Sequence, residues 1–244
     1  YTIPSKGALK SLRGRSLYLD ILLEHIVDEI LEACHVSRSC LLYTGGGHFY
    51  LLLPNTTHTQ AVLQKADSLI NDWFLQHYGT KLYIALASEP CSADDFSVRG
   101  GGAGKVFQKV SQALGQKKLC RYDEQQLTAL FDAQSRYNKD TDGSRECAIC
   151  HTASPAADLQ PYGEDTGDGA EEACASCNAL FRLGKSSLTA SMFVISPSAG
   201  REGVPLPGLA QPYYLQAIRE KELAAMDKPK RIYVKNEITL GQAV

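Results

Sequence analysis

The chain has 244 residues, of which 44% are hydrophobic and 21% are charged, and these are ordinary values for a globular protein. They exclude a disordered or fibrous chain, and no run approaches the roughly 18 apolar residues that a membrane-spanning helix requires. The formal net charge of -2, from 25 basic and 27 acidic residues, excludes a globally basic nucleic-acid-binding protein but not a local basic face.

The chain begins with a tyrosine, and the segment Tyr1–Pro4 lacks the charged and then apolar layout of a signal peptide. It is typical of the end of an apolar segment. We therefore expect a fragment of a longer, cytoplasmic protein.

The first half of the chain combines helical and strand-like hydrophobic spacing. In chain order, the spacing predicts a helix at 16–34, hairpin strands at 40–43 and 48–53, a helix at 56–78 and a strand at 82–87. With one strand placed before Tyr1, this order becomes β-α-β-β-α-β, the ferredoxin-like arrangement, in which the first strand is central.

The second half of the chain is more irregular. Short helices are expected at 104–114 and 124–133, with a strand at 118–122 between them and a polar linker at 138–144. A strand at 188–195, a loop at 196–212, a helix at 214–226 and a strand at 231–235 follow.

Four of the eight cysteines form two CxxC pairs separated by 23 residues. Two such turns, Cys147–Cys150 and Cys174–Cys177, complete a closed shell of four sulfur ligands around a tetrahedral ion. A pair of disulfides or a redox-active CxxC is the alternative, but the chain length and the missing secretory signal favour structural zinc. The other cysteines lie in or beside apolar segments and are expected to pack as small hydrophobic side chains: Cys34, Cys40, Cys91 and Cys120.

A basic cluster lies near the start of the chain and comprises Lys6, Lys10, Arg13 and Arg15. On a loop that enters a helix, such a cluster can hold the phosphates of a nucleotide or of RNA. It can equally be a solvated edge that binds nothing, and the residues alone leave both interpretations open.

The turn of the predicted hairpin has the sequence Gly45, Gly46, Gly47, His48. In palm-type polymerases and cyclases, a GGDD or GGDEF hairpin of this shape carries carboxylates that hold divalent metals together with an aspartate on the first strand. Here Gly47 and His48 stand in place of the acids, and neither can hold magnesium. We expect a catalytically empty hairpin whose glycines still let the backbone approach a nucleotide.

Three ordered motifs together resemble the large subunit of type III-A CRISPR interference complexes: residues 5–16 (SKGALKSLRGRS), residues 42–49 (LYTGGGHF) and the two CxxC pairs. That family has an HD nuclease domain, a first palm, a zinc-bearing linker domain, a second palm with an intact GGDD, and a helical domain. The resemblance implies an α+β fold. Its first part would be a ferredoxin-like palm domain at 1–136 without its first strand, and its second a four-cysteine zinc-binding α/β linker domain at 137–244.

Full-length members of that family serve in antiviral defence, where they cleave single-stranded DNA and, using divalent metal, convert ATP to cyclic oligoadenylates when target RNA is bound. Neither the HD pair nor the GGDD occurs in this chain, so the question of enzymatic activity stays open. The resemblance implies ATP contact by a non-catalytic palm through Gly45, Gly46, Gly47 and His48, with Arg15 and Ser16 beside them. The implied partners are the other subunits of the effector complex and, through the complex, guide RNA and target RNA, with no membrane.

Two other functions remain open. The chain can be a purely structural, metal-stabilised scaffold that packs against partner subunits and binds no nucleotide. It can also be a zinc-ribbon RNA-binding module, although its net charge of -2 disfavours RNA binding by the chain as a whole.

Overall fold

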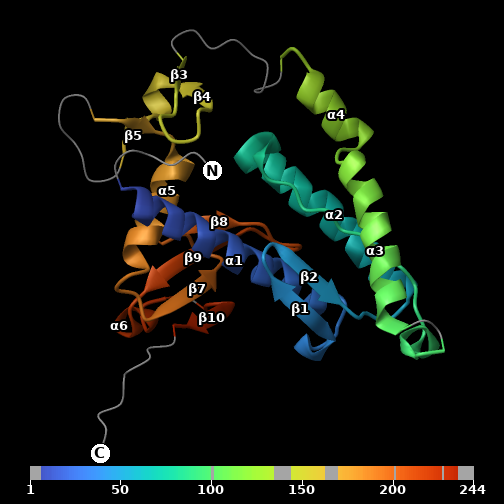
Figure 1. Ribbon diagram of the computed structural model, residues 1–244. Helices are drawn as coiled ribbons and strands as arrows, with labels where there is room; N and C mark the ends of the chain where they lie inside the picture. The colour runs from blue at the N-terminus through green and yellow to red at the C-terminus, as the bar shows by residue number, and fades with distance from the viewer. Residues whose placement is uncertain are drawn as a thin grey trace, which may run out of the picture. The chain divides into compact units, whose positions relative to one another are not determined.

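In the computed structural model, the described residues are 7–99, 102–134, 144–162, 170–200, 202–226 and 228–235. They form a mixed structure of helices and small antiparallel sheets, which confirms the expected combination of α and β elements (Figure 1). Two compact units are present: a sheet unit of residues 1–26, 44–49 and 141–244, and a helical unit of residues 27–43 and 50–140. The predicted domain boundary between residues 136 and 137 lies outside the described residues and stays a prediction.

The sheet unit contains a four-stranded antiparallel sheet in the order β10-β7-β9-β8. Its strands are β7 (Met192–Ser196), β8 (Val204–Leu206), β9 (Tyr213–Ile218) and β10 (Arg231–Val234). The helix predicted at 214–226 is wrong, since its first residues belong to β9 and only α6 (Glu220–Leu223) is helical. Tyr213 and Leu215 are buried and Tyr214 between them is not, so the burial follows the two-residue period of a strand.

The helix α1 (Ala8–Ala33) packs the first part of the chain against this sheet. Tyr18 is buried, and its hydroxyl donates to the carbonyl oxygen of Pro205 at 2.8 Å. The helix begins at Ala8 rather than at the predicted Ser16, because the residues before Ser16 are held by another helix, as described below.

His25 is a fully buried polar residue of α1 with both ring nitrogens engaged. Its Nδ1 lies 2.9 Å from the guanidinium of Arg231, and its Nε2 lies 2.7 Å from the carbonyl oxygen of Pro207. Because a guanidinium only donates, Nδ1 accepts and the proton resides on Nε2, which donates to Pro207. One neutral imidazole thus connects α1 to the edge strand β10 and to the loop after β8.

The first turns of α1 contact α5 (Ala175–Ser186) through the two backbones. A Cβ atom at Gly14 would overlap the carbonyl oxygen of Leu180, and one at Gly184 would overlap the carbonyl oxygen of Lys10. Only glycine fits at either position, and this contact explains why the helix continues through the basic segment that precedes Ser16.

Two small hairpins complete the sheet unit. The strands β3 (Ser144–Glu146) and β4 (Ala153–Pro155) pair with each other, as do β5 (Gln160–Pro161) and β6 (Glu172–Ala173). They surround a small core of their own, made with α5 by Cys147, Ile149, Leu159, Tyr162, Ala173, Cys177 and Phe181.

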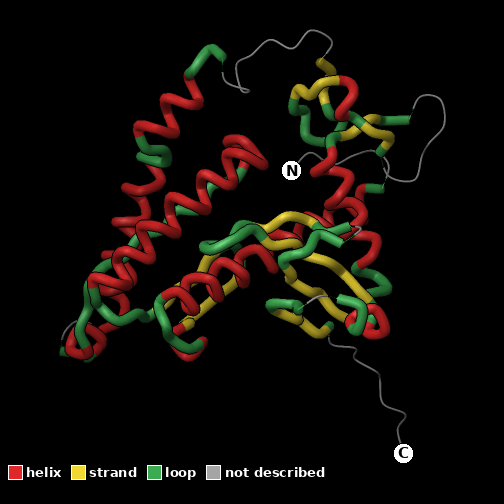
Figure 2. The backbone as a smooth tube through the Cα atoms, turned by 180° about the vertical axis from the view of Figure 1, so that it is seen from behind, coloured by secondary structure: helices red, strands yellow, loops and turns green. Residues whose placement is uncertain are grey.

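Helices make up most of the helical unit, and Figure 2 shows them as red tubes. They are α2 (Thr57–Tyr78), α3 (Gly102–Leu119) and α4 (Glu124–Phe131), with short 3-10 turns at Arg38–Cys40, Gly79–Lys81 and Ala93–Phe96. Lys117 of α3 forms an ion pair with Asp67 of α2 at 2.5 Å, so these two helices lie side by side. Within the described residues, no helix is both long enough and apolar enough to cross a membrane.

The predicted bounds of α2 and α4 agree closely with the observed ones, and a capping residue begins each helix. The side chain of Thr56 accepts from the backbone of Thr59, and Asp123 forms a capping box with Gln126. The strand predicted at 118–122 is wrong, since α3 continues to Leu119. Cys120, at the end of that helix, is exposed rather than packed, whereas Cys34 is buried and Cys40 and Cys91 are half-buried.

The hairpin of β1 (Leu41–Gly45) and β2 (His48–Leu51) is confirmed, but residues 82–87 form no strand. Among the described residues, no strand pairs with this segment. Instead the buried amide of Asn71 donates to the carbonyl oxygen of Ile84 and accepts from its N–H, both at 3.0 Å. A strand requires a neighbouring backbone, so the ferredoxin-like arrangement stays a proposal.

The contact between α1 and α5 predicts the effect of adding one methyl group. Gly14→Ala should destabilise the sheet unit by about 2 kcal/mol, because the two helices must separate. We expect a thermal midpoint lower by roughly 4–8 °C in circular dichroism. Gly115→Ala in α3 is the matched control, since a Cβ there meets no atom within 4 Å. Equal midpoints for the two variants would show that the α1–α5 contact carries no stability.

Candidate metal centre and glycine hairpin

The four CxxC cysteines converge at one end of α5. Cys147 and Cys150 lie in the turn between β3 and β4, Cys174 is the N-cap residue of α5, and Cys177 lies in its first turn. The four sulfur atoms all lie within 4.8 Å of one another, and those of Cys150 and Cys174 are 3.8 Å apart. A tetrahedral ion with bonds of about 2.3 Å to sulfur separates its ligands by about 3.8 Å, so this geometry suits zinc.

Three polar groups surround these sulfur atoms. The backbone N–H of Cys174 donates to Cys147 Sγ at 3.3 Å, and the hydroxyl of Thr152 lies 3.1 Å from Cys150 Sγ. The guanidinium of Arg15 donates to Cys177 Sγ at 3.9 Å. Donors of this kind stabilise thiolates and fix their orientation around a metal ion.

The crowding of the thiols separates their pKa values. Hydrogen bonds from Cys147, Cys174 and Cys177 hold the pKa of Cys150 well below its usual value. Hydrogen bonds to Cys147 and Cys150, together with burial, raise the pKa of Cys177 far above it. Four thiolates this close repel one another, so their joint ionisation requires a cation among them.

The structure does not contain the alternative pair of disulfides. All eight cysteines are free, and the 3.8 Å between Cys150 and Cys174 is far longer than the roughly 2.05 Å of an S–S bond. His151, next to Cys150, is exposed and its Nδ1 lies 3.8 Å from the carboxylate of Glu146, so it lies outside the sulfur cluster.

The tip of the β1–β2 hairpin consists of glycines in a left-handed conformation. Gly46 and Gly47 have φ angles of 58° and 79°, as the two central residues of a type I′ turn require. A Cβ atom at either position would meet nothing within 4 Å, so both residues are open to a ligand. The exposed His48 folds back, with its Nδ1 3.0 Å from the carbonyl oxygen of Gly46.

The remaining predicted site residues lie along α1. Ser16 is exposed, and Arg15 is half-buried with its guanidinium at Cys177. Lys10, of the basic cluster, lies with its Nζ 5.6 Å from the ring centroid of Phe181, whereas Lys6 lies outside the described residues. The structure therefore places two of the basic side chains against α5, and their contact with a nucleotide stays a prediction.

Sequence reasoning missed Gly14 as a structural residue of the first motif. The available signal was its position three residues after Ser11 and four before Tyr18, which places these residues on one helical face. That signal becomes meaningful only when the partner Gly184 is known.

Comparison with known proteins identifies relatives over the whole chain. The Mycobacterium tuberculosis protein named "CRISPR system single-strand-specific deoxyribonuclease Cas10/Csm1 (subtype III-A)" is 34% identical over 259 residues, covering 100% of this chain and 30% of that protein. The Enterococcus italicus protein of the same name is 33% identical over 245 residues, covering 99% of this chain and 29% of that protein. The chain thus spans less than a third of the length of these relatives.

Solved structures give weaker similarities. A Csm1-Csm4 cassette in complex with pppApA is 30% identical, with a TM-score of 0.45 over 46% of this chain and 16% of that chain. The apo Csm1-Csm4 cassette is 28% identical, with a TM-score of 0.48 over 51% of this chain and 17% of that chain.

The decisive match is to the family described as Csm1 subunit domain B, whose sequence profile covers residues 1–134, more than half of the chain. The chain therefore belongs to the Csm1 family, the large subunits of type III-A CRISPR effector complexes.

Proposed function

We propose that this chain acts within a longer large subunit, where residues 1–136 form a non-catalytic palm that helps to bind ATP for cyclic oligoadenylate synthesis. Residues 137–244 then form a zinc-bearing linker domain. The whole protein also cleaves single-stranded DNA in this proposal, the activity that the names of its relatives state. The effector subunits, guide RNA and target RNA remain its expected partners, and the cytoplasm its expected location.

The observation that carries the nucleotide proposal is the open tip of the β1–β2 hairpin. Gly46 and Gly47 leave room for a ligand to reach the backbone N–H groups, which can donate to phosphate oxygens. Residues 41–53 contain no aspartate or glutamate, so the hairpin neither holds catalytic magnesium nor repels a triphosphate. Its contribution is to position an ATP for a second, catalytic palm, and positioning of reactants can be worth several kcal/mol.

Substitutions at Gly46 test this proposal in the full-length protein. Gly46→Val should lower oligoadenylate synthesis at least about tenfold, about 1.4 kcal/mol in activation free energy, while DNA cleavage is largely spared. Valine at a positive φ also strains the turn, however, so a second variant must separate the two effects.

Gly46→Asn provides that separation. Asparagine tolerates the left-handed conformation, and its Cβ meets no protein atom, so the hairpin keeps its shape. If a nucleotide approaches the backbone here, the asparagine side chain blocks it, and synthesis falls as in Gly46→Val. Normal synthesis by correctly assembled Gly46→Asn protein would mean that the hairpin is a scaffold.

The fragment alone should have no catalytic activity. We expect the purified chain, supplied with ATP and magnesium, to form no oligoadenylates in a chromatographic assay, because the hairpin offers no carboxylate. Oligoadenylate synthesis by this chain would show that another group holds the metal ions.

For the cysteine cluster we propose a structural zinc ion bound by Cys147, Cys150, Cys174 and Cys177. The separation of 3.8 Å between two of the sulfur atoms and the surrounding donors support this proposal. Four protein ligands leave no position for substrate, so the ion would stabilise the fold and take no part in catalysis.

Metal content tests the zinc site directly. We expect about one equivalent of zinc per chain by elemental analysis, and loss of most of it in Cys174→Ser, because three ligands hold zinc much more weakly. Cys120→Ser is the matched control, since Cys120 is exposed and outside the cluster. Less than half an equivalent in the unmodified protein, or equal losses in the two variants, would contradict the proposal.

A further inference from the structure

A long acid-free segment surrounds α3. Residues 96–122 contain six cationic side chains and no aspartate or glutamate, although the whole chain has a net charge of -2. The cations are Arg99, Lys105, Lys109, Lys117, Lys118 and Arg121. Such a concentration of one charge attracts polyanions locally, whatever the sign of the net charge.

The orientation of α3 directs most of this charge outward. Lys117 faces α2, where it pairs with Asp67. Lys105, Lys109, Gln112 and Gln116 follow one another at i, i+4, i+7 and i+11 and therefore share one flank of the helix. All four are exposed, and none of the residues of α3 is buried. One flank of the helix thus offers two cations and two amides, and Asp95 of the preceding 3-10 turn lies near enough to Lys109 to interact with it electrostatically.

The opposite flank of the exposed face carries aromatic side chains. The ring of Phe107 meets that of Tyr50 edge-on at 5.1 Å, and the ring of Tyr50 lies 6.5 Å from that of Tyr43. Tyr43 is 54% exposed and Phe107 is 37% exposed, so both ends of this aromatic row are accessible. Exposed rings in a row can stack with the bases of a single strand.

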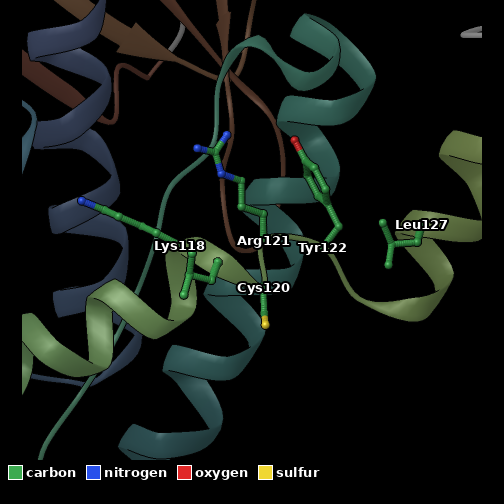
Figure 3. Close-up of a pocket in the computed structure, with 6 residues that line it drawn as sticks. Lys118, Cys120, Arg121, Tyr122 and Leu127 are labelled. Carbon is green, nitrogen blue, oxygen red and sulfur yellow. The ribbon is translucent and has the colours of Figure 1, made fainter.

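The cationic surface continues beyond the end of α3. Lys118 and Arg121 line a hollow of about 420 Å³ together with Leu119, Cys120, Tyr122 and Leu127. Figure 3 shows the side chains of Lys118, Cys120 and Arg121 leaving the chain in different directions, with Tyr122 beside Arg121. The guanidinium of Arg121 lies 5.7 Å from the ring centroid of Tyr83, and Arg121 is exposed.

We propose that the exposed face of α3 and the aromatic row bind a single-stranded nucleic acid. The phosphates lie along the flank of Lys105 and Lys109, and the bases turn toward Phe107 and Tyr43. A cationic flank beside exposed aromatic rings favours a single strand over other anions. An acidic peptide has no bases to stack on the rings, and a duplex has no free base faces. The inference is independent of the proposed ATP contact, since these residues belong neither to the glycine tip nor to the cysteine cluster.

The test measures binding of the 244-residue chain to fluorescein-labelled 15-nucleotide oligo(U) RNA and oligo(dT) DNA by fluorescence polarisation, between 50 and 200 mM salt. Lys105→Glu combined with Lys109→Glu should weaken binding at least tenfold at 50 mM salt. Because each phosphate contact in a single strand contributes about 0.7 to the salt slope, the slope should fall by about 1.4. Lys65→Glu combined with Lys221→Glu is the control, since both lysines are exposed elsewhere and the change in net charge is the same.

The contribution of the aromatic row can be measured separately from that of the lysines. Tyr43→Ala should weaken binding about fivefold and leave the salt slope unchanged, because stacking releases no counterions. Circular dichroism and zinc content verify the fold of each variant. Tighter binding of the RNA identifies RNA as the ligand through its 2′-hydroxyls, and equal or tighter binding of the DNA identifies a strand read by backbone and bases alone.

Three results would overturn the inference. The first is no binding by the unmodified chain at 50 mM salt. The second is an equal loss of affinity in the control with the reversed charges elsewhere. The third is polyglutamate or a DNA duplex binding as tightly as the single strands, which would show a general attraction of anions.

Discussion

Two glycines let α1 and α5 touch through their backbones, and much of the sheet unit depends on that contact. Gly14 and Gly184 each lie where a single methyl group would overlap the carbonyl oxygen of the other helix. The short distance between the helix axes brings Arg15 within reach of Cys177 and lays Lys10 along the ring of Phe181. These two basic side chains therefore contact α5 instead of forming a solvated edge. The same helix then continues to Tyr18 and His25, whose hydrogen bonds to the loop around β8 join the beginning of the chain to residues almost two hundred positions later.

Because α5 begins at the cysteine cluster and also contacts α1, it connects the candidate metal site to the contact between the two helices. Cys174 caps α5 and Cys177 lies in its first turn, while Phe181 one turn later belongs to the small core beneath the cluster. Structural zinc sites contribute on the order of 10–16 kcal/mol of apparent binding free energy in small peptides, far more than the two short hairpins around this site can provide. A bound ion would therefore fix the start of α5, and through Gly184 the start of α1. The arginine at Cys177 adds a positive charge where the thiolates would otherwise repel one another.

The parts of the fold that the sequence predicted are those determined by local chemistry. The glycine turn between two apolar runs predicted the hairpin, hydrophobic spacing predicted α2, and the spacing of the two CxxC pairs predicted one four-cysteine cluster. The errors lie where distant residues decide. Residues 214–218 are apolar enough for a helix, but their position between β7 and β8 imposes a two-residue period. The side-chain amide of Asn71 forms the hydrogen bonds with the backbone of Ile84 that a neighbouring strand would form. No sequence pattern in either segment predicts this contact. Gly14 resembles a helix breaker until its partner is known. The glycine tip and the cysteines of the candidate site were thus predictable, whereas the position of Arg15 was not.

The distribution of acids is the last constraint that the chain reveals. Its 27 aspartates and glutamates outnumber its cations, yet none lies in residues 41–53 or in residues 96–122. These are the segments that present the glycine tip and the exposed face of α3. A carboxylate near either surface would repel phosphate, and Asp95, which interacts electrostatically with Lys109, lies just before the second segment. Solubility alone is served equally well by mixed charges, as on α1, where Arg13, Asp20 and Glu32 are exposed. The scarcity of acids in both segments agrees with the phosphate-containing ligands that we propose for them. A nucleotide at the glycine tip and a single-stranded nucleic acid at α3, the two ligands proposed, share the phosphate group, and neither segment contains a carboxylate that would repel it.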